Sequence, residues 1–114
     1  MNHEIAEAWV RRLEKGDIIQ TTGRLGTPRG ARCCLGVLCD MAVEQGIIPK
    51  PEVFANHLSY DGESGILPLA VQIWAGMQSV NGTHTEGQPL SVLNDEGTSF
   101  KPIAGVIRTH RDGL

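Results

Sequence analysis

The sequence has few aromatic residues and no long apolar run, and both absences narrow the class of protein. Aromatic side chains make up 4% of the 114 residues, so the core must be built mainly from Leu, Ile, Val and Ala. No apolar stretch approaches the roughly 20 residues that a membrane-spanning helix needs. The first segment, MNHEIAEAWVRR, also lacks the apolar run of a secretory signal. We therefore expect no membrane partner and a single compact domain over residues 1–114.

Basic residues are scarce in the middle of the chain. Residues 33–97 contain one basic residue, Lys50, and eight acidic residues, whereas residues 1–32 and 98–114 each carry a net charge of +2. The formal net charge of the whole chain is −3. A protein that binds duplex nucleic acid through its phosphates is normally basic, so we expect no duplex nucleic-acid partner. The basic first third instead favours a local site for a small anion.

Cysteines are few and confined to one segment. Residues 30–40 read GARCCLGVLCD and hold all three cysteines, Cys33, Cys34 and Cys39. An odd number with two neighbours is not the pattern of a secreted disulfide framework, and it indicates a reducing cytosol. A structural zinc site typically needs two ligand pairs such as Cys-x2-Cys, a spacing that is absent here. We therefore expect no metal, no cofactor and no disulfide.

The apolar periodicity predicts an α+β fold that is mainly helical, with about five short helices. Asn2 can cap the first helix and Ser99 can cap the last one. The other helix boundaries are indicated by glycine and proline, which end or begin a helix. Helices are expected over about residues 3–15, 34–45 and 69–77, in a short segment from Leu90, and from Phe100 onward.

Turn-forming residues predict two small β-hairpins. The first is expected over residues 18–33, around the turn GTPRG. The second is expected over residues 57–68, around the Asp61-Gly62 pair. Residues 47–57, which contain Pro49 and Pro51, are expected to form a loop.

The helix expected over residues 34–45 allows two interpretations of its cysteines. At 100° per residue, Cys34 and Cys39 fall on or beside the apolar face around Leu35, which favours a packing role. Alternatively, Cys34 is a nucleophile, because the first turn of a helix favours a thiolate. The candidate partners of such a nucleophile are His57 or His84 as base and Asp40, Asn94 or Asp95 as the group that orients it.

The stretch TTGRLGTPRGARC is not a P-loop, since it has no Gly-Lys-Ser/Thr end, and it does not match the dinucleotide-binding fingerprint either. It nevertheless joins a glycine-rich turn to Arg24, Arg29 and Arg32, ahead of a helix N-terminus. Guanidinium groups make forked contacts with phosphate or carboxylate, so these arginines are a candidate anion site. A solvated hairpin tip explains the same residues. Tyr60 and Trp74 are candidates to stack on a base, with core packing as the alternative.

Several segments resemble a family of small, largely uncharacterised phage and prophage proteins. They are AWVRRLEKGDIIQTTGRL, RCCLGVLCDMA, the YDG…LP…WAGM stretch and LNDEGTSFKPIAGVI, of which CCLGVLCD is the most specific. Together they cover about two-thirds of the chain. The resemblance implies a viral or prophage accessory protein in the cytoplasm of a bacterial host. It implies no catalytic residue.

Three hypotheses of function follow. The first is a non-enzymatic accessory protein that antagonises host defence by sequestering a small nucleotide-like signal, through Arg24, Arg29 and Arg32 with Tyr60 or Trp74. The second is a direct inhibitor that binds a host protein. The third is a hydrolase or transferase that uses Cys34. A homodimer is a further expectation, because small binding domains often close a site across a twofold axis.

Overall fold

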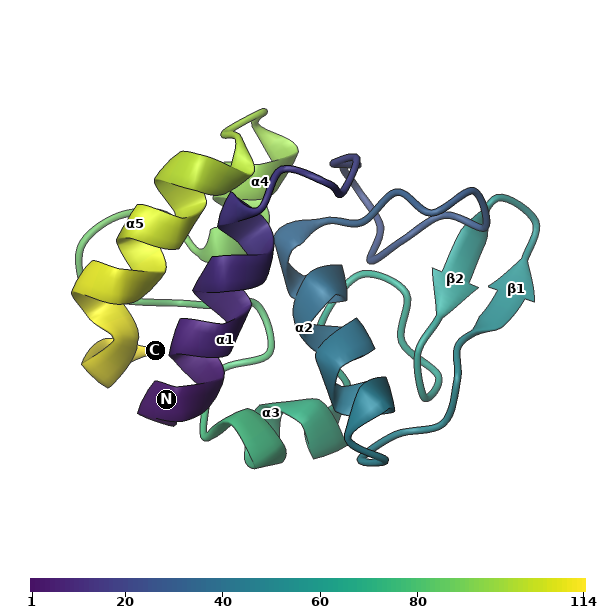
Figure 1. Ribbon diagram of the computed structural model, residues 1–114, viewed down its shortest axis with the longest axis horizontal. Helices are drawn as coiled ribbons and strands as arrows, with labels where there is room; N and C mark the ends of the chain where they lie inside the picture. Colours follow the sequence, from purple (N-terminus) through teal and green to yellow (C-terminus); the bar gives the residue numbers. More distant parts are fainter.

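The computed structural model describes residues 1–114 and shows five α-helices and one two-stranded antiparallel sheet (Figure 1). The predicted class, α+β and mainly helical in one compact domain, is confirmed. No helix has the length and apolar character needed to cross a membrane. The helices are α1 (His3–Glu14), α2 (Cys34–Glu44), α3 (Leu69–Ala75), α4 (Leu90–Asp95) and α5 (Phe100–His110), the strands are β1 (Glu52–Phe54) and β2 (His57–Ser59), and a 3-10 turn, η1 (Arg111–Gly113), follows α5.

Helix α2 lies at the centre, with α1 and α5 on one side and the sheet on the other (Figure 1). Eight of its eleven residues are buried, because apolar side chains occupy more than one of its faces. Trp9 of α1 is fully buried, and its Nε1 donates a 2.9 Å hydrogen bond to the carbonyl of Cys34. At the surface, the guanidinium of Arg12 binds both carboxylate oxygens of Glu44 and so links α1 to α2.

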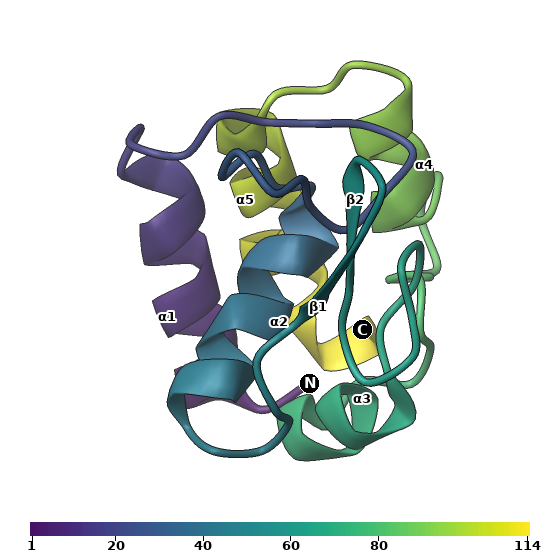
Figure 2. The same cartoon turned by 90° about the vertical axis from the view of Figure 1, so that its right-hand side faces the viewer.

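The expected hairpin over residues 18–33 does not form. Its only β-pairing consists of isolated bridges, which pair Arg32 with Gln20 and with Gly26. On one side of Arg32, its N–H donates to the carbonyl of Ile19, and its own carbonyl accepts from Thr21. On the other side, the N–H of Cys33 donates to the carbonyl of Leu25. Each pairing is limited to a single bridge, so no continuous strand pair forms. Figure 2 shows the segment after α1 crossing above α2 to reach α4.

The second hairpin forms earlier in the chain than the sequence predicts. Residues 52–54, expected in a loop, form β1, and the turn lies at Ala55-Asn56. Ala55 adopts a left-handed conformation with φ of 52°. Asp61-Gly62 also forms a turn, but only one isolated bridge flanks it, so no strand extends from it. Pro51 does not prevent the strand, because it precedes the first strand residue.

The helix caps agree with the sequence at one end of the chain and differ at the other. Asn2 caps α1, where its side chain accepts a 2.9 Å hydrogen bond from the N–H of Ile5. Ser99 occupies the N-cap position of α5, but its side chain makes no capping hydrogen bond. The two ends of the chain lie close together, and the Met1 amino group donates to the carbonyl of Arg111 at 3.1 Å.

Candidate functional site

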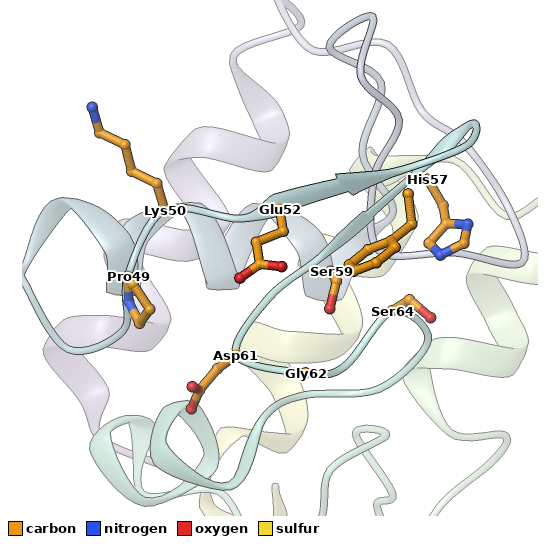
Figure 3. Close-up of a pocket in the computed structure, with 9 residues that line it drawn as sticks. Pro49, Lys50, Glu52, His57, Ser59, Asp61, Gly62 and Ser64 are labelled. Atoms are coloured by element: carbon orange, nitrogen blue, oxygen red, sulfur yellow. The ribbon is translucent and has the colours of Figure 1, made fainter.

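The β1–β2 hairpin and the loop beside it form two hollows in the surface, which we name separately. The arginine groove has a volume of about 400 Å³ and lies between residues 24–29 and the hairpin turn. The carboxylate hollow has a volume of about 430 Å³ and lies between the hairpin and the turn at residues 61–64 (Figure 3). Backbone pairing joins the two segments, since the N–H of Leu58 donates to the carbonyl of Gly26 at 3.0 Å.

Arg24 and Arg29 both line the arginine groove. Arg29 is exposed, and Arg24 makes one hydrogen bond, from Nη1 to the carbonyl of Asn56 at 3.3 Å. Neither guanidinium has a carboxylate partner, in contrast to four other arginines of the chain, Arg11, Arg12, Arg32 and Arg108. Two positive groups in one groove therefore remain free to bind an external anion.

Arg32 is bound within the protein. Its Nε donates to Asp40 Oδ2 at 2.7 Å, and its Nη1 donates to the carbonyls of Thr27 and Ala31. Tyr60, fully buried, donates from its hydroxyl to the other carboxylate oxygen of Asp40 at 2.5 Å. Burial raises the pKa of Tyr60, and its hydrogen bond to Asp40 raises it further. Arg32 and Tyr60 therefore hold α2 to the hairpin region, and they line neither hollow.

Trp74 lies on α3, where it is half-buried against the core and lines neither hollow. The aromatic groups near the arginines are instead Phe54 and His57, which sequence reasoning did not identify as a stacking surface. Their rings lie 6.2 Å apart at 21°, and Phe54 is 51% exposed. The one indication of this surface in the sequence is the apolar pair Phe54-Ala55 before Asn56. Pro49 and Pro51 obscured it, because they indicate a loop.

The carboxylate hollow brings polar side chains together on one face of the hairpin. Glu52 pairs in register with Ser59, so these two side chains lie side by side, while Lys50 points away from the hollow (Figure 3). Asp61 and Ser64 line it from the opposite turn. No serine in this hollow forms a hydrogen bond with a histidine or a carboxylate. The hollow therefore does not contain a nucleophile in contact with a base and an orienting acid.

The three thiols are buried and serve the packing of α2. Cys33 caps the helix, with Sγ accepting from the N–H of Gly36 at 3.4 Å, and burial raises its pKa to about 11. Cys34 is fully buried, and its Sγ donates to the carbonyl of Leu90 at 3.7 Å. Burial also raises the pKa of Cys34 and of Cys39 well above the usual value. An inaccessible, protonated thiol is a poor nucleophile, which weighs against a cysteine-dependent enzyme.

The histidines proposed as bases lie apart from the thiols. His57 stacks on Phe54, and His84 stacks on His110 with ring centres 4.7 Å apart. The Nε2 of His84 bonds to the carbonyl of Gln88 at 2.8 Å, so that nitrogen carries the proton. No group of three or more His, Cys, Asp or Glu side chains has a geometry that could hold a metal ion.

Asn94 has a larger role than the sequence indicates. Its fully buried amide oxygen accepts from the backbone N–H of Cys34 at 3.1 Å and from Gln20 at 2.8 Å. Its amide nitrogen donates to the carbonyl of Thr21 at 2.9 Å. The side chain therefore joins α4, the first turn of α2 and the loop after α1. Its neighbour Asp95 accepts from the N–H of Gly23 and adds a further tie.

A comparison with protein-family models gives one match, to a family described as a domain of unknown function (DUF8296), over residues 1–111. No curated protein and no solved structure matches the chain.

Proposed function

The chain belongs to the DUF8296 family of domains of unknown function, and we propose that it is a non-enzymatic binding protein. In this proposal it is a phage-type accessory protein that acts in the cytoplasm of a bacterial host. Its three free thiols suit a reducing compartment. The resemblance of the CCLGVLCD segment to phage and prophage proteins supports the origin. The ligand is a host component, and antagonism of host defence is the proposed consequence of binding.

The observation that carries the proposal is the pair of free guanidinium groups in the arginine groove. Arg24 and Arg29 face one hollow of about 400 Å³ without a carboxylate partner. Thr27 also lines the groove. A guanidinium group binds phosphate or carboxylate through a forked pair of hydrogen bonds, and a phosphate has enough oxygens to bind two guanidinium groups at once. An anionic, phosphate-bearing small molecule is therefore the ligand class that we propose.

A half-exposed aromatic ring makes a nucleotide-like ligand the preferred member of that class. Phe54 precedes Ala55 directly, and Ala55 lines the arginine groove. Phe54 itself lines the carboxylate hollow on the other face of the hairpin. A ligand can bind the arginine groove and Phe54 together. Its phosphate then lies in the groove, and the ligand extends across the turn so that its base stacks on Phe54. Phe54 thus replaces Tyr60 and Trp74 in the stacking role.

Thermal unfolding with a panel of phosphate ligands tests this function. The panel contains inorganic phosphate, mononucleotides and cyclic mono- and dinucleotides. A nucleotide at a hundredfold excess over its Kd is expected to stabilise the protein by about 2.7 kcal/mol. The Arg24→Ala/Arg29→Ala variant should lose this stabilisation, whereas the control Arg11→Ala, an exposed arginine of α1, should retain it. Absence of stabilisation by every member of the panel would contradict the proposal.

Direct binding of a host protein is a second candidate, favoured by the free edge of β1. All three residues of β1 are exposed, and only β2 pairs with it. Because the N–H of Leu58 points to Gly26, the Val53–Leu58 pair is not hydrogen-bonded, and the N–H and carbonyl of Val53 face outward. An added strand from a partner could bind these groups.

The two candidates differ in the variants that abolish binding. Val53→Pro removes the outward N–H of the edge strand and should release a stoichiometric host protein that co-purifies with the chain. Arg24→Ala/Arg29→Ala should leave that complex intact. If the double arginine variant releases the protein and Val53→Pro does not, edge-strand binding is wrong.

A further inference from the structure

The carboxylate hollow and the arginine groove differ in charge. Glu52 and Asp61 line the hollow, and its one lysine, Lys50, points away from it (Figure 3). The groove has two guanidinium groups and no carboxylate in its lining. The two charges fix the direction of a bound nucleotide, because the guanidinium groups attract its phosphate and the carboxylates of the hollow repel it. Since a carboxylate only accepts hydrogen bonds, the part of the ligand in the hollow must donate them.

Glu52 is the carboxylate best placed to meet a base that stacks on Phe54. Both residues lie on β1 and line the hollow. They are two residues apart, and alternate residues of a strand share one face, with Cα atoms about 7 Å apart. The Glu52 carboxylate points across the hollow towards the turn at residues 61–64 (Figure 3). Unlike the carboxylates of Asp40 and Glu44, which bind arginines, it has no ion-pair partner and is free to accept hydrogen bonds from a ligand.

We propose that the hollow selects guanine as the base, an inference that rests on the nucleotide binding proposed above. Guanine presents two adjacent donors, N1–H and the N2 amino group, and one carboxylate binds both through a forked pair of hydrogen bonds. Adenine and cytosine instead place the lone pair of a ring nitrogen beside their amino group, and that lone pair would face the carboxylate. Uracil has a single N–H between two carbonyls. Guanine is therefore the base that Glu52 binds best.

Ser59 places a hydrogen-bond donor beside this acceptor. Ser59 and Glu52 pair in register on β2 and β1, and both line the hollow. The O6 carbonyl of guanine lies next to N1–H on the same edge of the base. When Glu52 accepts from N1–H and the N2 amino group, the hydroxyl of Ser59 donates to O6. The two side chains thus match the order of donors and acceptors on guanine.

Calorimetric titration of the wild-type protein with GMP, IMP and AMP tests the selection. The three ligands share the ribose 5′-phosphate and a purine that stacks on Phe54, so differences in affinity report the edge of the base. IMP lacks the N2 amino group and should bind about 10- to 100-fold more weakly than GMP. AMP lacks both donors and should bind at least about 100-fold more weakly.

The Glu52→Gln variant tests the role of this side chain. A glutamine amide offers one acceptor and one donor, which match the amino group and ring nitrogen of adenine, so the preference for GMP over AMP should disappear. Glu52 is exposed on β1, so the change does not disturb the core. The matched control is Glu86→Gln, since Glu86 is exposed and lines neither hollow. This control should prefer GMP as the wild-type protein does.

The outcomes separate this inference from the function on which it rests. Equal binding of GMP and AMP to the wild-type protein, abolished in Arg24→Ala/Arg29→Ala, would overturn guanine selection and leave nucleotide binding in place. A preference for GMP that persists in Glu52→Gln would also overturn the inference. If none of the three nucleotides binds, both the inference and the proposed nucleotide binding are wrong.

Discussion

At the scale of single residues, the side chains that look most reactive are used to hold the fold. Helical phase predicted that Cys39 lies on the apolar face of α2 and Cys34 at its edge, and both are buried because α2 is packed on more than one side. The fate of Arg32 and Tyr60 could not be predicted. Both bind Asp40, which is 8 residues from Arg32 and 20 from Tyr60, and only the tertiary fold brings them together.

The buried thiols should be unreactive in the native protein. Iodoacetamide near neutral pH is expected to modify none of Cys33, Cys34 and Cys39, since burial keeps them protonated and inaccessible. In urea, above the unfolding transition, all three should react. Mass spectrometry counts the adducts. Rapid modification of native Cys34 would revive the hypothesis of a cysteine enzyme.

The same thiols make stability fall at alkaline pH. The pKa of Cys33 is about 11 in the folded state against 9.0 for the free group, so the folded protein holds its proton more tightly. This stabilisation is complete below pH 9 and is lost as the pH rises through the folded pKa. The free energy of unfolding should decrease by up to about 1.4 kcal/mol per pH unit for each buried thiol. Urea titrations at pH 8 and pH 10 measure the loss, and a Cys33→Ser variant should show a smaller one.

At the scale of the elements, the sequence predicts the helices well and the strands poorly. Helices α1, α2 and α5 have apolar periodicity, and glycines mark the ends of α1 and α2, so local patterns define them. The strands are three residues each and depend on contacts with Gly26, which no local pattern reveals. The floor of the arginine groove, formed by the turn at Ala55-Asn56, was therefore not predicted either.

The packing of α2 against the loop before it requires glycine at position 36. A Cβ there would lie 1.8 Å from the carbonyl oxygen of Leu25, so Gly36→Ala should prevent native packing or destabilise the protein by more than about 3 kcal/mol. Gly105 in α5 is the control, because a Cβ there meets nothing within 4 Å. Gly105→Ala should stabilise the protein by about 0.5–1 kcal/mol through helix propensity. Urea unfolding distinguishes the two, and equal effects would refute this account of α2.

At the scale of the whole molecule, buried polar side chains stabilise the fold, whereas exposed ones are available for binding. Asp40 and Asn94 join distant segments to α2, whereas neither Arg24 nor Arg29 has a carboxylate partner within the chain. Changes to the first group should alter stability, and changes to the second should alter binding. This separation explains which polar residues are available for function.

Calorimetric titration of the binding nucleotide, combined with urea unfolding, of the wild-type protein and two variants tests whether binding and stability depend on separate residues. Arg24→Ala/Arg29→Ala should abolish binding and change the free energy of unfolding by less than about 0.5 kcal/mol. Asp40→Asn, which weakens the ties to Arg32 and Tyr60, should lower that free energy by about 2 kcal/mol and leave the affinity of the folded protein unchanged. The account is contradicted if Asp40→Asn removes binding at unchanged stability while the double arginine variant binds like the wild-type protein.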